Sequence, residues 1–288
     1  MSAAPDLTHV SRAERDQRLG ATLVRMGKLD GEAINRIVEA QRRMKAPFAS
    51  AASRLGLVSK EDLHTALGVQ HGFLRIDETE GKLPKAMLTV RRPASPEAAQ
   101  FRAMRARMLT SKNRDDVKAF AIASNTTSRE SDYVALNLAA SFAQLKKRVL
   151  LVDTDMRAPR LARYFSMPAG PGLRDVLGAG IDIRNAIRAS IVSNLSVLTA
   201  GEGAGDADDL LAGDLLRLSV EYLRCAYDNV IYLTTPFGAS TDAQFVWSTV
   251  GNVMVVTRRN EDRMAQLKSL HGALRQVDAN IIGAALAG

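Results

Sequence analysis

The chain has 288 residues, a net charge of +8, 46% hydrophobic residues and one cysteine, Cys225. This length suits one large domain and one small domain, and the single cysteine excludes an internal disulfide framework and fits a reducing cytoplasm. No apolar run reaches the roughly 18 residues of a membrane span, residues 1–6 do not resemble a signal peptide, and the four histidines lack metal-ligand spacing.

The positive charge is spread unevenly along the chain. Residues 1–92 carry 16 Lys/Arg against 11 Asp/Glu, and residues 93–288 carry 23 against 20. A basic first part suggests an anionic partner, such as a nucleotide, a nucleic acid or a membrane surface, with solubility as the plain alternative. Few aromatic residues lie near the basic ones, which argues against a platform for single-stranded nucleic acid, so no nucleic-acid partner is expected.

Four regions follow one another along the chain. Residues 1–16 are polar and expected to be disordered, and residues 17–76 are helical. Residues 77–96 are expected to form a linker, because Pro93 and Pro96 disfavour a helix. In residues 97–288, wholly apolar runs alternate with helical segments, which is typical of an α/β domain with a mostly parallel sheet. The predicted strands are 119–123, 149–152, 195–198, 230–233, 253–256 and 281–284.

The helical region contains two copies of a 24-residue pattern. The first copy begins with Arg18-Leu19-Gly20 and ends at Gln41. The second runs from residue 47 to Gln70 and replaces the leading Arg-Leu-Gly by Pro-Phe-Ala, which weakens half of a two-part site. The pattern resembles the repeat of MshE-type N-terminal domains, and this resemblance implies binding of cyclic di-GMP.

The residue types of the first copy suit such a ligand. Arg18 offers a bidentate fork to a phosphate or to guanine, and Gly20 lets a ligand approach the backbone. The alternative is a helical docking domain in which the leucines and glycines only build the core and the turns. The candidate cyclic di-GMP residues are Arg18, Leu19, Gly20, Leu23, Gly27, Gln41, Arg54 and Gln70.

The predicted strand 119–123 leads into a segment where a phosphate-binding loop would lie. The pattern G-x-x-x-x-G-K-[ST] needs glycines whose N–H groups surround phosphates and a lysine that reaches them. In register, those positions are Asn125, Glu130, Ser131 and Asp132, so neither glycine nor lysine remains. Ser128, Glu130, Ser131 and Asp132 are therefore candidate residues of a degenerate, inactive nucleotide loop.

Further motifs in residues 95–288 support one relationship. The segments 149–159, 171–178 and 227–231 resemble those of the bacterial tyrosine autokinases of capsule and exopolysaccharide synthesis, which belong with the MinD/ParA-type ATPases. The resemblance implies a P-loop NTPase-like sheet flanked by helices. The Walker B position, where a carboxylate holds Mg²⁺, falls on Leu233, and the sequence ends at Gly288 without that family's tyrosine cluster. ATP and Mg²⁺ are not expected as cofactors.

The acidic motif leaves two interpretations open. Asp153, Asp155 and Arg157 are either relics of a metal-proximal motif or structural, with Asp153 ending a buried strand and Asp155 capping the next helix. Arg157 and Arg160 could bind an anion or be solvated. The family's ring-forming motif keeps only Arg102 and Arg105, a candidate region for self-association.

These observations predict a non-catalytic regulator or scaffold of exopolysaccharide biosynthesis and export. It would be cytoplasmic and peripheral at the inner membrane, where it docks on a membrane polysaccharide co-polymerase or export protein under cyclic di-GMP control. One alternative is an active, divergent tyrosine kinase or ATPase of exopolysaccharide synthesis. The other is a ParA-like positioning factor associated with DNA, suggested by the basic charge.

Overall fold

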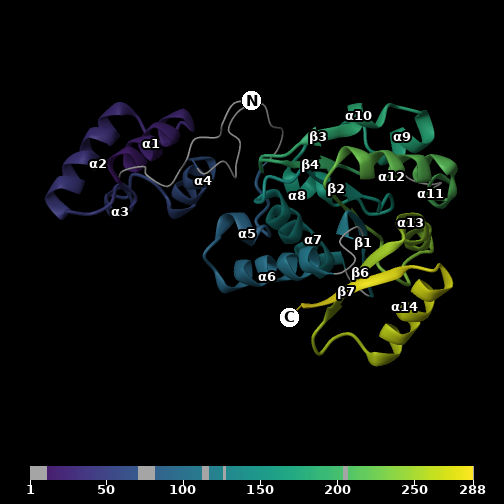
Figure 1. Cartoon of the computed structure of the whole chain (residues 1–288). Helices are drawn as coiled ribbons and strands as arrows, with labels where there is room; N and C mark the ends of the chain where they lie inside the picture. Colours follow the sequence, from purple (N-terminus) through teal and green to yellow (C-terminus); the bar gives the residue numbers. More distant parts are fainter. Residues whose placement is uncertain (1–11, 71–81, 112–116, 126–127, 204–206, 288) are drawn as a thin grey trace. The chain divides into compact units, whose positions relative to one another are not determined.

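The computed structural model describes residues 12–70, 82–111, 117–125, 128–203 and 207–287. The chain divides into two compact units, Met1–Asp77 and Glu78–Gly288, which we call unit 1 and unit 2 (Figure 1). The N-terminal residues 1–11 and the loop residues Thr126 and Thr127 lie outside the described residues. Among the described residues, every helix is too short or too polar to cross a bilayer.

The described residues of unit 1 form helices and turns, as the sequence predicts. Its helices are α1 (Arg12–Arg25), α2 (Gly31–Met44), α3 (Phe48–Arg54) and α4 (Lys60–Gln70). The internal repeat is visible in two matching turns, because Gly27 and Gly56 both have φ of +66°. Glycine reaches this left-handed region without the steric cost of a Cβ atom.

The segment predicted to be a linker belongs largely to unit 2. It contains the short helix α5 (Leu88–Arg91), and the N–H of Thr89 donates to Oδ1 of Asn137 at 2.9 Å. The two prolines that suggested a linker instead flank a helix start. Pro96 is the first residue of α6 (Pro96–Thr110), and Ser95 caps it by accepting the N–H of Ala98 at 3.1 Å.

Unit 2 is a seven-stranded sheet in the order β3-β4-β2-β5-β1-β6-β7, and all neighbours are parallel except β3 and β4. All six predicted strands are present, as β1 (Ala119–Ser124), β2 (Val149–Asp153), β4 (Leu195–Leu198), β5 (Asn229–Leu233), β6 (Asn252–Arg258) and β7 (Asn280–Ala287). The sequence analysis missed the three-residue edge strand β3 (Ile187–Ala189), which is too short to show a pattern.

Helices cover both faces of this sheet (Figure 1). The central strands β1, β2 and β5 are buried along their whole length, which is why their sequences are apolar throughout. Together with α5 and α6, the helices of unit 2 are α7 (Ser128–Ala143), α8 (Leu161–Phe165), α9 (Leu173–Ala179), α10 (Ile183–Ala186), α11 (Ala207–Ala212), α12 (Asp214–Ala226), α13 (Asp242–Val250) and α14 (Met264–Gln276).

The order β2-β5-β1 brings the carboxyl ends of three strands to one place. Asp153, the last residue of β2, pairs in register with Leu233 of β5, and Leu233 pairs with Ile122 of β1. The carboxyl edge of a parallel α/β sheet is where such folds place their functional groups. The loops that follow these strands are therefore the expected location of a functional site.

Candidate functional site

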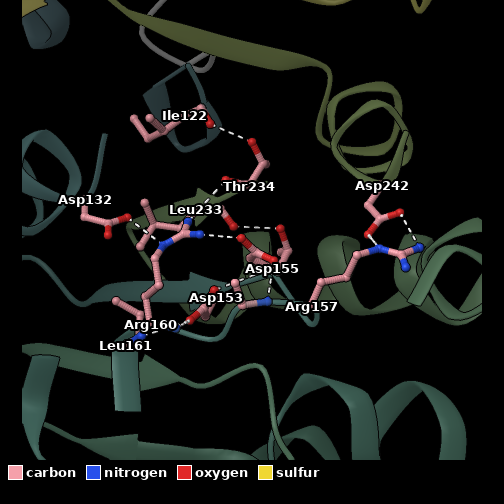
Figure 2. Close-up of polar contacts among 12 residues, drawn as sticks. Ile122, Asp132, Asp153, Asp155, Arg157, Arg160, Leu161, Leu233, Thr234 and Asp242 are labelled. Atoms are coloured by element: carbon pink, nitrogen blue, oxygen red, sulfur yellow. Dashed lines mark hydrogen bonds and ion pairs between the residues drawn. The ribbon is translucent and has the colours of Figure 1, made fainter. Parts of the chain in front are cut away.

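A buried group of charged residues lies at this edge of the sheet (Figure 2). Asp132 comes from the first turns of α7, Asp153 ends β2, and Asp155 and Arg160 follow in the next loop. Each of these four residues is at most 3% exposed. We call them the aspartate–arginine cluster.

Arg160 is the centre of the cluster. Its Nε donates to Oδ1 of Asp132 at 2.9 Å, its Nη1 donates to Oδ2 of Asp155, and its Nη2 donates to the carbonyl oxygen of Thr234 at 3.2 Å. The sequence left this arginine as either anion-binding or solvated, and both interpretations are wrong. A guanidinium has five N–H donors in a rigid fork, and here three of its nitrogens bind acceptors of the protein itself.

Asp153 binds the backbone of the loop that follows β2. Its Oδ2 accepts the N–H groups of Arg160 at 2.6 Å and Leu161 at 2.9 Å, at the start of α8. Asp155 accepts the N–H of Ala158 at 2.9 Å, within the same loop. The structural interpretation of these aspartates is therefore supported, but it is Asp153 that caps the next helix, and not Asp155 as predicted.

Three carboxylates lie near a single guanidinium, which pairs directly with Asp132 and Asp155, so the cluster is short of positive charge. Burial raises the pKa of Asp132 to about 6, although Arg160 acts in the opposite direction. Burial likewise raises the pKa of Asp153. For Arg160, burial works to lower the pKa, but the surrounding aspartates outweigh it and raise the pKa above its usual value. Arg160 remains charged, and an aspartate is the group that takes up a proton first.

This charge imbalance predicts a pH dependence of stability. Folding raises the pKa of Asp132, so the folded state binds a proton as pH falls through about 6 and the unfolded state does so only near 4. Stability from this group therefore falls as pH rises from about 4 to 6, by about 2–3 kcal/mol. Asp132→Asn should remove this decline, and chemical denaturation of both proteins at several pH values measures it. An unchanged pH dependence in the variant would contradict the assignment.

Thr126 and Thr127 of the loop lie outside the described residues, and the other residues of the loop differ in burial. Ser131 is 1% exposed, Glu130 is half-buried, and the side chain of Ser128 lies outside the described residues. Leu233, at the Walker B position, is fully buried between neighbouring strands. Within the described ranges, His, Cys, Asp and Glu residues form no group of three or more that could hold a metal ion. The side chains at these described positions are hydroxyls, carboxylates and an aliphatic group, where a phosphate-binding loop and its Walker B strand have glycine, lysine and a carboxylate.

Arg157 joins the cluster's loop to two helices. Its Nε lies 2.7 Å from Oδ2 of Asp242 at the start of α13, and its Nη2 lies 3.3 Å from Oδ1 of Asp208 in α11. Hydrogen bonding to Asp242 is the main cause that raises the pKa of Arg157. Arg157 is therefore neither a free anion-binding group nor simply solvated, as Figure 2 shows for its contact with Asp242.

Arg102 and Arg105, the candidate self-association residues, contact their own unit. Nη1 of Arg102 donates to the carbonyl oxygen of Pro93 at 2.7 Å. Nη1 of Arg105 donates to the carbonyl oxygen of Ser141 in α7. Self-association through this region stays a prediction.

Unit 1 contains a pocket of about 830 Å³ between α1, α2 and α3. Of the predicted ligand residues, Gly20 and Gln41 line it. The sequence pattern missed Asp16, whose Oδ2 accepts Nε2 of Gln41 at 2.8 Å and so orients that amide. The other lining residues are Gln17, Ala21, Ile34, Val38, Arg42, Lys45, Ala46 and Phe48.

Arg18 lines a second, smaller pocket of about 380 Å³. Thr22, Arg25 and Val69 line it as well, and Ala21 lines both pockets. Arg18, Thr22 and Arg25 are spaced by four and three residues, so they lie along one side of α1. This pocket places two arginines together, which the sequence pattern did not indicate.

The other predicted ligand residues of unit 1 have structural roles or lie apart from both pockets. Leu19 and Leu23 belong to the core, at 3% and 0% exposure, and Gly27 forms the turn after α1. Arg54 lies 3.8 Å from the sulfur of Met44. The side chain of Gln70 lies outside the described residues. The predicted set is therefore divided, because the helical period of α1 places its leucines and its arginines on different sides.

Comparisons with known proteins relate the chain to bacterial tyrosine-protein kinases. It is 28% identical over 208 residues to the tyrosine-protein kinase YwqD of Bacillus subtilis, which covers 72% of this chain and 87% of the relative. It is 29% identical over 151 residues to the tyrosine-protein kinase ptk of Acinetobacter johnsonii, covering 52% of this chain but only 21% of that relative. Most of the length of ptk thus has no counterpart here. No protein-family model matches the chain.

Solved structures support the same relationship. The kinase domain of the Escherichia coli tyrosine kinase ETK matches with a TM-score of 0.66 and 26% identity, over 74% of this chain and 84% of that domain. The chimerical protein CapA2B2 matches with a TM-score of 0.66 and 25% identity, over 79% and 98%. The α/β fold with a mostly parallel sheet, flanked by helices, is confirmed.

Proposed function

We propose that unit 2 is a non-catalytic relative of the bacterial tyrosine-protein kinases that acts as a regulator or scaffold. The single observation that carries this proposal is the position of Arg160, buried among three aspartates at the carboxyl edge of the sheet. Phosphoryl transfer depends on a lysine and a metal ion that neutralise the transferred phosphate. Here the loop offers neither lysine nor glycine, and the nearby carboxylates already bind an internal cation and backbone N–H groups.

The energetic consequence is large. One electrostatic contact to the transition state is worth about 3–4 kcal/mol, so losing both the lysine and the metal anchor removes roughly 6–8 kcal/mol. Since each 1.36 kcal/mol is a factor of ten in rate, turnover should fall by about 10⁴ to 10⁶. Unit 2 would thus keep the fold of the kinase domain, lose phosphoryl transfer, and act by binding another protein.

Assays of ATP hydrolysis and tyrosine phosphorylation test this proposal. We expect the full chain with Mg²⁺ and ATP to show neither ATP hydrolysis nor tyrosine phosphorylation above a heat-inactivated control. The ETK kinase domain, assayed in parallel, serves as the positive control for the conditions. Turnover that disappears in an Asp153→Asn variant would show that the cluster is catalytic and would overturn the proposal.

The setting we propose is exopolysaccharide biosynthesis and export. The relatives are tyrosine-protein kinases, and the resemblance described above implies a membrane polysaccharide co-polymerase or export protein as the docking partner. The chain would then be a cytoplasmic protein that reaches the inner membrane through this partner. Co-purification of the full chain with the co-polymerase of its own gene neighbourhood tests this, and its absence from that complex would contradict it.

For unit 1 we propose that the pocket between α1, α2 and α3 binds cyclic di-GMP. Ile34, Val38 and Phe48 supply apolar surface to a purine, and Gln41 supplies a directional amide. Arg18 and Arg25 supply positive charge to phosphate from the adjoining pocket. Binding would bias docking of the chain on its membrane partner, which is a coupling between two sites.

A further inference from the structure

Asp16 links the three helices that surround the larger pocket of unit 1. It belongs to α1, and its Oδ2 accepts Nε2–H of Gln41 in α2 at 2.8 Å and the backbone N–H of Phe48 at 3.4 Å. Phe48 is the first residue of α3, and Pro47 at the N-cap position makes no side-chain cap. Asp16 therefore binds an N–H group that the start of a helix leaves without a partner inside the helix.

These contacts decide which atoms the pocket offers to a ligand. An ionised carboxylate has two oxygens, and both only accept hydrogen bonds. Both contacts of Asp16 use Oδ2, so Oδ1 is the oxygen that a molecule in the pocket can use. Because Nε2 of Gln41 already donates to Asp16, Oε1 of that amide is likewise an acceptor for a ligand. The pocket thus presents two neighbouring acceptors.

Two neighbouring acceptors match guanine and do not match adenine. The Watson–Crick edge of guanine carries two adjacent donors, N1–H and the amino group at C2. Adenine has an acceptor, N1, in place of the first donor and no amino group at C2. With adenine, the carboxylate oxygen would meet a lone pair, and a polar group left without its partner in a binding site is costly.

We propose that Asp16 makes this pocket select guanine over adenine. Oδ1 of Asp16 and Oε1 of Gln41 accept the two donors on the edge of the base. This inference rests on the proposed binding of cyclic di-GMP by unit 1, and it names the residue that distinguishes this ligand from cyclic di-AMP, its analogue with adenine bases. Arg42 and Lys45 line the same pocket and offset the negative charge of Asp16 near a phosphodiester.

A purely structural role for Asp16 gives a different expectation. Asparagine has nearly the same size and keeps one acceptor oxygen, so Asp16→Asn retains an acceptor for Gln41 and Phe48. It replaces the other oxygen by an amino group, which donates. This donor opposes N1–H of guanine but matches N1 of adenine. If Asp16 only caps α3 and orients Gln41, the preference between the two bases should be the same in Asp16→Asn and the wild type.

Calorimetric titration of the full chain with cyclic di-GMP and with cyclic di-AMP tests the proposal. The wild type should bind cyclic di-GMP roughly 100-fold more tightly or better, and Asp16→Asn should lower this ratio by about ten-fold or more. Both ligands carry two phosphates, so the effect of a lost charge on their attraction to the chain cancels in the ratio. Glu39→Gln removes the same charge from an exposed position of α2 outside the pocket, and this matched control should keep the ratio of the wild type.

The monophosphates GMP and AMP, titrated by NMR, separate this inference from the proposed function. Preference for GMP that depends on Asp16, without binding of cyclic di-GMP, would support guanine selection and contradict the proposed ligand. Binding of cyclic di-GMP with an unchanged ratio in Asp16→Asn would overturn the inference alone. A wild type that binds none of these nucleotides would overturn both. Circular dichroism of each variant confirms that the helices remain folded.

Discussion

Replacing Arg160 by leucine should lower the free energy of unfolding of unit 2 by about 3–5 kcal/mol, since it leaves buried carboxylates without their counter-charge. The guanidinium binds Asp132, Asp155 and a backbone carbonyl, and Arg160 is only 3% exposed to solvent. For a unit of this size, the melting temperature should fall by about 6–20 °C. Leucine retains most of the aliphatic part of the arginine side chain, so the loss of stability comes chiefly from removing the charged guanidinium.

Tryptophan fluorescence can follow the unfolding of unit 2. Trp247 is the only tryptophan of the chain, is fully buried in unit 2, and donates to Oγ1 of Thr234 at 3.3 Å. Its fluorescence therefore follows unfolding of this unit in denaturant. Arg184→Leu is the matched control, because both members of the Arg184–Asp182 ion pair are exposed to solvent and its loss should shift the midpoint much less. Equal midpoints for the Arg160 and Arg184 variants would show that the cluster is not a structural centre.

A double variant separates charge imbalance from lost packing. Adding Asp132→Asn to Arg160→Leu removes one of the uncompensated carboxylates. We expect it to recover part of the lost stability at pH 7, since breaking a buried ion pair costs more than removing both of its members. A double variant that is less stable than Arg160→Leu alone would contradict this reasoning.

The second large expected effect is on the affinity of the chain for cyclic di-GMP. We expect the full chain to bind it, and Gln41→Ala to weaken binding at least ten-fold, because Gln41 provides a directional hydrogen bond inside the pocket. Arg18→Ala should also weaken binding, and the remaining affinity should depend less on salt because a cation is lost. Arg54→Ala is the matched control, since Arg54 lies beside Met44 and does not line either pocket.

Calorimetric titration of the wild type and the three variants measures these affinities. If the wild type shows no saturable binding, unit 1 is a docking domain and the ligand proposal is wrong. If the wild type binds and Arg54→Ala has the largest effect, the ligand occupies a different surface from the pocket.

The sequence alone predicted most of the fold because its signals are local. The wholly apolar runs at β1, β2 and β5 identify strands buried on both faces, and six of seven strands were located in this way. The two-copy pattern of unit 1 recurs in the structure, where Gly27 and Gly56 have the same positive φ.

The site could not be predicted to the same degree because its contacts are distant in the sequence. Arg160 binds Asp132, 28 residues away, and Thr234, 74 residues away, and no local pattern distinguishes it from a solvated arginine. In unit 1 the pocket is completed by Asp16 and Phe48, which belong to different helices and lie outside the first repeat. Only the packing of the helices brings them together.

A titration of the full chain with Mg²⁺ and ATP, followed by calorimetry, tests the central claim most directly. The buried aspartate–arginine cluster predicts no saturable heat at concentrations that saturate the ETK kinase domain in the same buffer. Saturable binding that weakens in the Asp155→Asn variant, which removes a charge from the cluster, would contradict the account.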